Sequence, residues 1–203
     1  MFPSPKQANK DGLLCYGGNL QADTLRSAYQ QAIFPFYSEG QAILWWSPDP
    51  RMVLFPDHFY CSRRLTRRLR QACYRFTHNA DFSAVIHACA EPRGGEDHNP
   101  WLLPDMIAAY IHLHQLGDAH SFEVWQGDDL IGGLYGVLQS QVFFAESMFS
   151  RQRDGSKMAM HTMVTHAKSS RWKLIDCQFY TEHLASMGAQ QISRDMLLSY
   201  LES

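Results

Sequence analysis

Apolar residues recur at helical spacing in several parts of the chain. Residues 82–89 carry large apolar side chains at positions i, i+3, i+4 and i+7, which predicts a helix packed on a core. A second helix is predicted from Pro104 to the residue before Gly117, since proline favours helix starts and glycine favours helix ends. A third is predicted over 155–170. Its inward residues are expected to be Met160, Met163, Val164 and Ala167.

Alternating polarity and turn residues predict strands elsewhere. The segment 120–150 reads as three strands separated by the turn signals QGDD and QS. Shorter strands are expected within 52–56, 74–80, 173–179 and 189–193. This order predicts an α+β fold with a mixed sheet, and it resembles the acetyltransferase-like (GNAT-like) architecture. Residues 1–51, rich in Pro, Gly and aromatics, are expected to form a small N-terminal domain packed on a domain of residues 52–203.

The composition is that of an ordinary globular protein. The 203 residues are 45% hydrophobic, which is enough for a sizeable core. No leader pattern and no run of about 18 apolar residues is apparent, so we expect no membrane association and a cytoplasmic protein. The five cysteines form no C-x-x-C pair, and the ten histidines lack metal-site spacing. Neither a metal nor a cofactor is therefore expected.

Positive charge is concentrated in one stretch despite the net charge of −2. Residues 61–76 contain six arginines and no acidic residue. In a helix, Arg63, Arg67 and Arg70 would share one face, and Leu65 and Leu69 would face the core. Such a face is either an ordinary solvated surface or a phosphate-binding surface, and the stretch alone leaves both open.

Two polar residues interrupt the apolar strand predicted over 173–179. By strand alternation Asp176 and Gln178 point to the same face, where they could bind a common group. Glu146 stands similarly in the strand ending at residue 150. Buried polar groups are unfavourable unless they are paired. The residues therefore either bond nearby backbone at a strand end or form a ligand site.

The first unit carries a dense set of aromatic residues. They are Phe34, Phe36, Tyr37, Trp45 and Trp46. Such rings can fill the interface between the two units, or they can stack on the bases of a single-stranded nucleic acid end.

Five segments, in order, resemble the leucyl/phenylalanyl-tRNA–protein transferases: AYQQAIFPFYS, ILWWSPDPR, ESMFSRQRDGSK, KLIDCQ and HLASMGA. The resemblance covers nearly the whole chain. It implies an enzyme that moves Leu or Phe, and weakly Met, from aminoacyl-tRNA to the α-amine of proteins beginning with Arg or Lys. It also implies a role in the N-degron pathway. We expect a monomer.

The resemblance also implies roles for individual residues. Asp176 and Gln178 match the catalytic pair, and Glu146 matches the acid beside it. From the chemistry of these groups we hypothesise that Gln178 orients the attacking amine, while Asp176 fixes the Gln178 amide and helps to receive the proton. Glu146 would hold a cationic amine or the ribose hydroxyl. Phe36 and Trp101 would stack on the terminal adenosine. The amino-acid pocket would be lined by Leu134, Phe143, Met160, Met163 and Ile175.

Two further expectations concern substrate binding. Arg63, Arg67 and Arg70 would hold tRNA phosphates. Ala167 is smaller than the aromatic residue expected there, and this difference could widen the amino-acid pocket.

Two other functions fit parts of the pattern. An acetyl-CoA-dependent N-acetyltransferase would share the architecture, and RQRDGSKMAM faintly resembles its phosphate-binding loop. Gly155, however, stands alone there. A non-catalytic RNA-binding module would account for the arginines and tryptophans but would leave Asp176 and Gln178 without a role.

Overall fold

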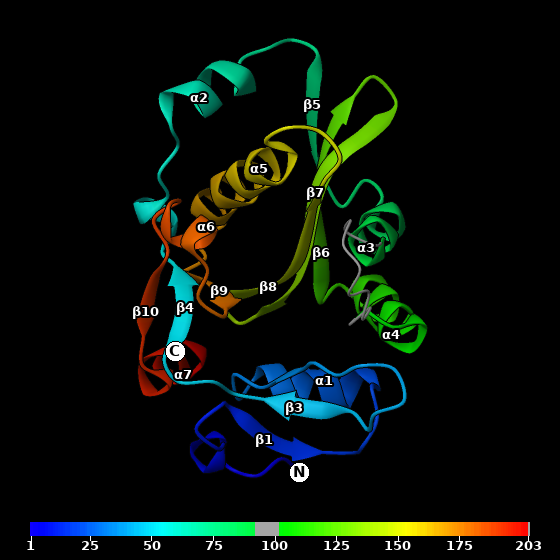
Figure 1. Ribbon diagram of the computed structural model, residues 1–203, viewed down its shortest axis with the longest axis vertical. Helices are drawn as coiled ribbons and strands as arrows, with labels where there is room; N and C mark the ends of the chain where they lie inside the picture. Colours follow the sequence, from blue (N-terminus) through cyan, green and yellow to red (C-terminus); the bar gives the residue numbers. More distant parts are fainter. Residues whose placement is uncertain (92–101, 203) are drawn as a thin grey trace.

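A seven-stranded mixed sheet forms the centre of the computed structural model, which describes residues 1–91 and 102–202 (Figure 1). Its strand order is β10-β4-β9-β8-β7-β6-β5, and all neighbours are antiparallel except β8 and β9. The strands are β4 (Arg51–Leu54), β5 (Tyr74–His78), β6 (Ala119–Gln126), β7 (Asp129–Gln139), β8 (Val142–Ser150), β9 (Leu174–Gln178) and β10 (Gln190–Ile192). The predicted mixed sheet and its three-stranded meander are confirmed.

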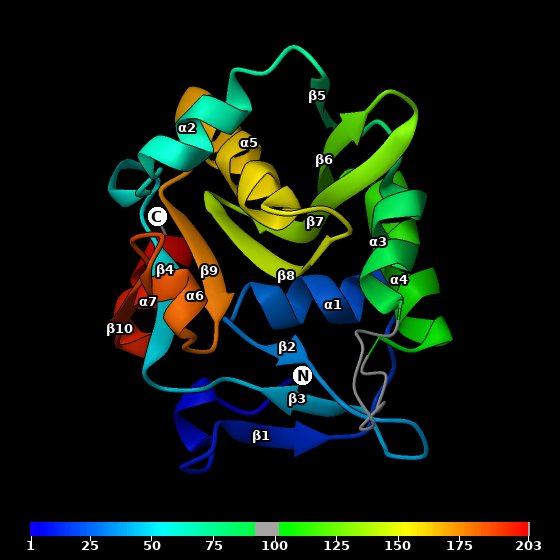
Figure 2. The ribbon, with the colours of Figure 1, turned by 45° about the horizontal axis from the view of Figure 1, so that its top comes forward.

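Helices cover both faces of this sheet. On one face, α3 (Phe82–Ala90) and α4 (Pro104–Gln115) pack on β6 and β7. On the other, α5 (Gly155–Ser169) crosses the same strands (Figures 1 and 2). Alternate residues of β7 serve the two layers, because Leu134 lies in the core beneath α5 and Tyr135 in the core beneath α3 and α4. The last helices are α6 (Glu182–Ala185) and α7 (Arg194–Leu201).

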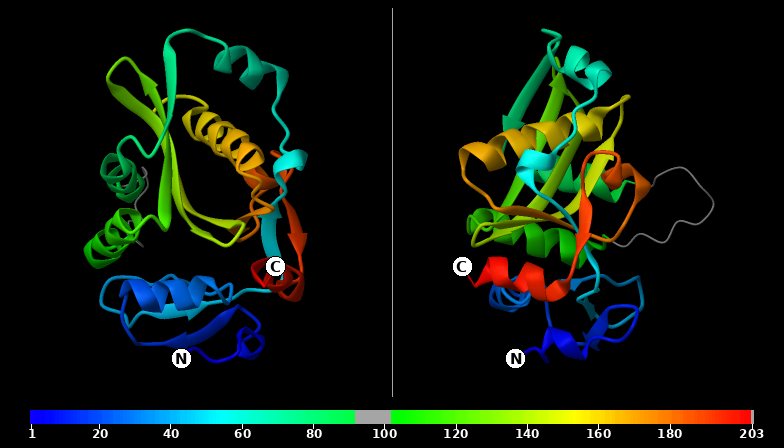
Figure 3. Two further views of the ribbon diagram at one scale, coloured as in Figure 1. Left: turned by 180° about the vertical axis from the view of Figure 1, so that it is seen from behind. Right: turned by 90° about the vertical axis from the view of Figure 1, so that its left-hand side faces the viewer.

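The first unit is a small sheet with one helix. Its strand order is β1-β3-β2, with β1 (Leu13–Tyr16), β2 (Phe34–Pro35) and β3 (Leu44–Trp46). Helix α1 (Ala22–Tyr29) lies between this sheet and the larger unit (Figure 3). Because the small sheet ends at Trp46 and the large sheet begins at Arg51, we propose that the two units divide near residue 51.

Several aromatic residues of the first unit are buried, and two of them, Phe34 and Tyr37, contact the larger unit. Phe34, Tyr37 and Trp45 are buried, and the Tyr37 hydroxyl donates to Asp105 of α4 at 2.7 Å. Phe36 differs, since 40% of it is exposed. Packing therefore accounts for Phe34, Tyr37 and Trp45, and Trp46 Nε1 donates to the Phe36 carbonyl oxygen at 2.6 Å.

The arginine-rich stretch folds as α2 (Arg63–Leu69) above α5 (Figure 2). Leu65 faces the core, and Arg63, Arg67 and Arg70 are exposed, as predicted. Arg68 instead contacts Asp154, at 3.2 Å, at the start of α5. This contact fixes the arginine helix to the helix beneath it.

Residues 1–91 and 102–202 contain neither a candidate membrane-spanning helix nor a candidate metal site. No helix there has the length and apolar character needed to cross a membrane. Within the same residues, no group of three His, Cys, Asp or Glu side chains is placed to hold a metal ion.

Candidate functional site

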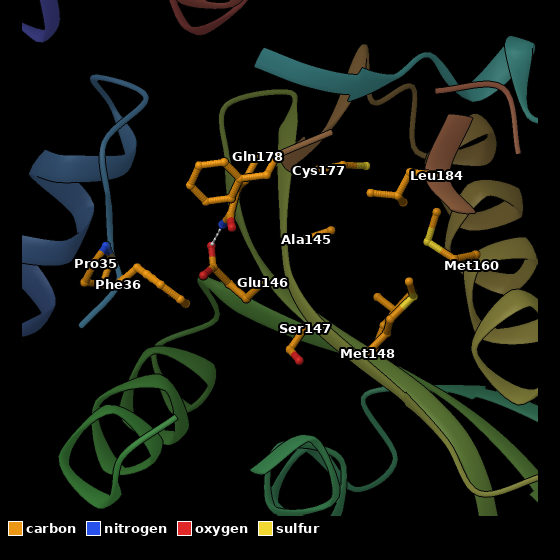
Figure 4. Close-up of a pocket in the computed structure, with 12 residues that line it drawn as sticks. Pro35, Phe36, Ala145, Glu146, Ser147, Met148, Met160, Cys177, Gln178 and Leu184 are labelled. Atoms are coloured by element: carbon orange, nitrogen blue, oxygen red, sulfur yellow. Dashed lines mark hydrogen bonds between the residues drawn. The ribbon is translucent and has the colours of Figure 1, made fainter. Parts of the chain in front are cut away.

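A cavity of about 290 Å³ opens where two neighbouring strands separate. Strands β8 and β9 pair in parallel, and their last pair is Phe144 with Asp176. Beyond it, residues 145–148 and 177–179 form opposite parts of the wall. The lining residues are Pro35, Phe36, Leu134, Ala145, Glu146, Ser147, Met148, Met160, Cys177, Gln178, Phe179 and Leu184 (Figure 4).

A β-bulge in β8 sets the position of Glu146. Tyr135 pairs with Ser147 and Gly136 pairs with Ala145, so Glu146 is the extra residue. A bulge redirects a side chain that regular alternation would place elsewhere. Gly136 is required opposite the bulge, because a Cβ atom there would lie 2.1 Å from the Phe144 carbonyl oxygen.

A second irregularity, at the end of β9, sets the position of Gln178. The pairing with β4 shifts, so that Cys177 is the extra residue, and Gln178 has a left-handed backbone with φ of 63°. This conformation costs about 1–2 kcal/mol outside glycine. The Gln178 N–H donates to Asp176 Oδ1 at 2.8 Å and stabilises the turn.

Asp176 is fully buried against Arg51, an arginine that the sequence patterns did not indicate. Arg51 Nε and Nη2 donate to the Asp176 carboxylate at 2.9 and 2.7 Å, and neither side chain is exposed. Arg51 Nη1 also donates to the Ala32 carbonyl oxygen, at 3.0 Å. The guanidinium lies over the ring of Phe34, 4.8 Å from its centroid.

This geometry corrects one expectation about the catalytic pair. The side chains of Asp176 and Gln178 do not share a face, because the bulge at Cys177 breaks the alternation. Asp176 binds the backbone N–H of Gln178, whereas the Gln178 side-chain amide donates to Glu146 Oε1 at 3.0 Å. Glu146, and not Asp176, is therefore the carboxylate that binds the side-chain amide of Gln178.

Glu146 is held by a chain of buried donors. The Tyr110 hydroxyl donates to Glu146 Oε2 at 3.3 Å, and the hydroxyls of Tyr29 and Tyr110 are 2.7 Å apart. Burial raises the pKa of Glu146 to about 7; hydrogen bonds from Tyr29, Gln178 and Tyr110 oppose the rise, and the charge of Asp176 adds to it. The carboxyl group can therefore gain or lose a proton near neutral pH.

Cys177 also lines the cavity, and its surroundings favour the neutral thiol. Burial, followed by the nearby charge of Asp176, raises the pKa of its thiol well above the usual range. The thiolate is the reactive form. The raised pKa disfavours the thiolate at neutral pH.

The Glu146–Gln178 pair has an apolar wall on one side and an aromatic lip, formed by Phe36, on the other. In Figure 4, Glu146 and Gln178 stand between Phe36 and a wall containing Met148 and Met160. Of the predicted pocket residues, Leu134 and Met160 line the cavity. Phe143, Met163 and Ile175 are fully buried in the core that includes these two residues. Seven of the twelve lining residues were not predicted from the sequence: Pro35, Ala145, Ser147, Met148, Cys177, Phe179 and Leu184.

Two other expectations have different outcomes. Ala167 does not line the cavity, because it is fully buried in the same core as Trp172, which stacks on Phe143 with ring centroids 4.9 Å apart. Trp101 lies outside the described residues, so its predicted stacking role stays a prediction.

The exposed arginines of α2, together with Arg70 just after its end, border a second hollow. Arg63, Arg67 and Arg70 line it together with Cys61 and Thr66. The arginine helix packs on α5, and α5 supplies Met160 to the cavity. A polyanion bound at the hollow is therefore one helix away from the candidate site.

The first two backbone N–H groups of α5 are already bonded within the protein. The N–H of Gly155 donates to Gln152 O at 3.0 Å, and that of Ser156 donates to Ser150 Oγ at 3.3 Å. A Cβ atom on Gly155 would lie 2.6 Å from the Ile131 carbonyl oxygen. Packing of the helix against β7 thus explains this glycine without a bound cofactor.

Comparisons with known proteins agree on one family. The family model for leucyl/phenylalanyl-tRNA protein transferase matches residues 53–202, and the model for its N-terminal domain matches 18–49. A leucyl/phenylalanyl-tRNA–protein transferase of Chromobacterium violaceum is 50% identical over 204 residues, covering 100% of this chain and 87% of the relative. One from Syntrophobacter fumaroxidans is 48% identical over 201 residues, covering 99% and 86%.

The similarity to one solved structure is weak. A GCN5-related N-acetyltransferase from Kribbella flavida matches with 9% identity and a TM-score of 0.43, covering 81% of this chain and 58% of that one. Similarity at this level does not indicate a shared activity.

We predict that Asp176→Ala lowers the free energy of unfolding by about 3–5 kcal/mol, because it leaves the buried Arg51 guanidinium unpaired. The double variant Arg51→Met/Asp176→Leu should recover most of this loss. Denaturant unfolding of both variants measures the difference. A loss below about 1 kcal/mol in the single variant would contradict the structural role of the ion pair.

Proposed function

The chain belongs to the leucyl/phenylalanyl-tRNA–protein transferase family, and from this membership we propose the substrates and the roles of the residues at its site. Its donors are Leu-tRNA and Phe-tRNA and, less efficiently, Met-tRNA. Its acceptors are proteins with an N-terminal Arg or Lys, and the product enters the N-degron pathway. We propose further that the enzyme acts in the cytoplasm as a monomer. The observation that carries the site assignment is the Glu146–Gln178 pair between an apolar wall and an aromatic lip.

The reaction needs positioning more than a strong catalyst. The acceptor α-amine attacks the ester carbonyl carbon of the aminoacyl-tRNA, an amide bond forms, and the bond to the ribose oxygen breaks. The amine loses a proton and the ribose oxygen gains one. With an amine pKa of about 8, a useful fraction of acceptor is neutral at physiological pH. Holding the two reactants together supplies much of the rate.

We assign the proton to Glu146 and the orientation of the amine to Gln178. The Gln178 Nε2 group donates to Glu146, and this bond leaves the amide oxygen of Gln178 able to accept from the attacking amine. Glu146 takes the released proton, directly or through water. Asp176, buried with Arg51, acts as a positioning residue through the backbone of Gln178.

The two sides of the cavity suit the two parts of the donor. The apolar wall, including Met148, Met160 and Leu184, would receive the amino-acid side chain. Phe36, with Trp101 as predicted from the resemblance, would stack on the terminal adenosine. A methylene group in such a pocket is worth about 1–3 kcal/mol, so Met is accepted less well without being excluded. Phe143, Met163 and Ile175 would support this wall from within the core.

The alternatives explain less of the site. An acetyl-CoA enzyme would need free donors at the start of α5, where Gly155 and Ser156 already bond within the protein. An RNA-binding module would not need a buried carboxyl group with a pKa of about 7 beside an oriented amide.

A transfer assay tests the proposal. Purified protein is mixed with radiolabelled Leu-tRNA and a peptide beginning with Arg, in parallel with the same peptide beginning with acetyl-Arg. Label should enter the free-amine peptide alone. Absence of transfer with Leu-tRNA, Phe-tRNA and Met-tRNA alike would refute the proposed donors.

We predict that Glu146→Gln lowers the transfer rate about 100-fold or more, because it removes the proton acceptor. In the parent enzyme the rate should fall as pH drops through about 7, where Glu146 becomes protonated. This limb should be absent from the variant, while the limb from the peptide amine at a pKa of about 8 should remain in both. Single-turnover rates between about pH 5.5 and 9 test this. An unchanged limb in the variant would exclude Glu146 as the base.

We predict that replacing Arg63, Arg67 and Arg70 by Gln raises KM for Leu-tRNA and lowers the salt slope by about 1 for each phosphate no longer bound. The control is Lys10→Gln, which removes an exposed charge from the first unit. The affinity for Leu-tRNA, measured from about 50 to 200 mM salt, gives the slope for each protein. Equal slopes in the parent and the triple variant would make the arginine helix an ordinary solvated surface.

A further inference from the structure

Two large exposed rings follow Gln178 directly and have no part in the assignments above. Phe179 is 42% exposed and lines the cavity, and Tyr180 is 55% exposed. Exposed apolar rings gathered beside a cavity are more typical of binding surfaces than of ordinary protein surface. In the chain they directly follow Gln178, and not its partner Glu146.

Phe179 is held by a backbone hydrogen bond and by an aromatic contact. Its N–H donates to the Cys177 carbonyl oxygen at 2.8 Å. Its ring meets that of Phe34 edge-on, with centroids 5.7 Å apart and an interplanar angle of 84°. Phe34 in turn carries the guanidinium of Arg51 on its face. The interactions that fix Gln178 therefore also orient the neighbouring ring before any substrate binds.

The connectivity of the acceptor places its first side chain close to this ring. The attacking α-amine and that side chain leave the same Cα atom, so an amine bonded to Gln178 keeps the side chain within reach of the adjacent residue. The side chain is a cation in the proposed acceptors. Glu146 is the one acidic residue among the described lining residues, and it is already bonded to Gln178 and Tyr110.

An aromatic face can recognise such a cation without a carboxylate. A guanidinium or ammonium group within about 6 Å of a ring centroid binds about 2- to 30-fold more tightly than a neutral group. The planar guanidinium of Arg also stacks on the ring, whereas Lys contributes a compact charge and an apolar stem.

We propose that Phe179 is a specificity-determining residue that receives the cationic side chain of the acceptor's first residue on its ring face, with Tyr180 flanking it. The inference rests on the proposed function. It assigns acceptor recognition to a ring, separate from the groups that handle the amine and its proton.

Citrulline, a neutral analogue of Arg with nearly the same shape, isolates the charge. At saturating Leu-tRNA, kcat/KM is measured for three peptides that begin with Arg, Lys or citrulline. Phe179→Leu should lower the Arg-to-citrulline ratio by about 2- to 30-fold. Phe179→Trp should preserve or raise it. KM for Leu-tRNA should not change in either variant.

The matched control is Tyr16→Leu, which removes a 78% exposed ring in β1 of the first unit. Its Arg-to-citrulline ratio should equal that of the parent enzyme. An unchanged ratio in Phe179→Leu, with active parent enzyme, would overturn this inference and leave the proposed function intact. A raised KM for Leu-tRNA in that variant would also overturn it, by assigning the ring to the donor. No transfer by the parent enzyme to any peptide would refute the proposed function itself.

Discussion

The buried ion pair between Arg51 and Asp176 is the interaction on which both the fold and the site depend. It joins residues 125 positions apart, in neighbouring strands of the large sheet. Through Ala32 and Phe34 it also ties the first unit to that sheet. A buried pair of this kind adds little stability compared with apolar packing, but its disruption leaves a charge without a partner. The main effect of the ion pair is therefore to position residues. It fixes Asp176, which accepts a hydrogen bond from the backbone N–H of Gln178 beside the cavity.

The same pair also affects the electrostatics of the candidate site. Burial raises the pKa of Glu146, and the negative charge of Asp176 raises it further. Arg51 neutralises much of that charge at a distance of 2.7 Å. Hydrogen bonds from Tyr110 and Gln178 lower the pKa again. These opposing effects leave the pKa near neutrality, the range in which a carboxyl group can accept a proton from an amine and release it to solvent.

Local patterns predicted the regular parts of the structure and not its irregular parts. Helical spacing placed α3 and α5, and turn residues placed the meander, because these signals lie within one element. Strand alternation failed at Gln178, since it cannot reveal a bulge whose origin is the pairing with another strand. Arg51 was missed for a similar reason. It precedes an apolar strand in the sequence, and only the folded chain shows that it is fully buried.

The family resemblance identified residues that local patterns could not rank. It named Glu146 and Gln178, and the structure then showed that they bond directly. It also named Asp176, for which we hypothesised a part in proton transfer, whereas its buried contacts support a positioning role. The contacts thus support a different proposed division of roles within a set of residues that the sequence had already indicated.

The proposed chemistry depends most on a carboxyl group that titrates near neutral pH. An NMR titration of the protein with ¹³C-labelled glutamate side chains measures this pKa directly, and Glu146→Gln assigns the signal. We expect the Glu146 carboxyl carbon to titrate with a pKa of about 7. A titration near 4.5, the ordinary value for glutamate, would contradict the assignment of the proton to Glu146.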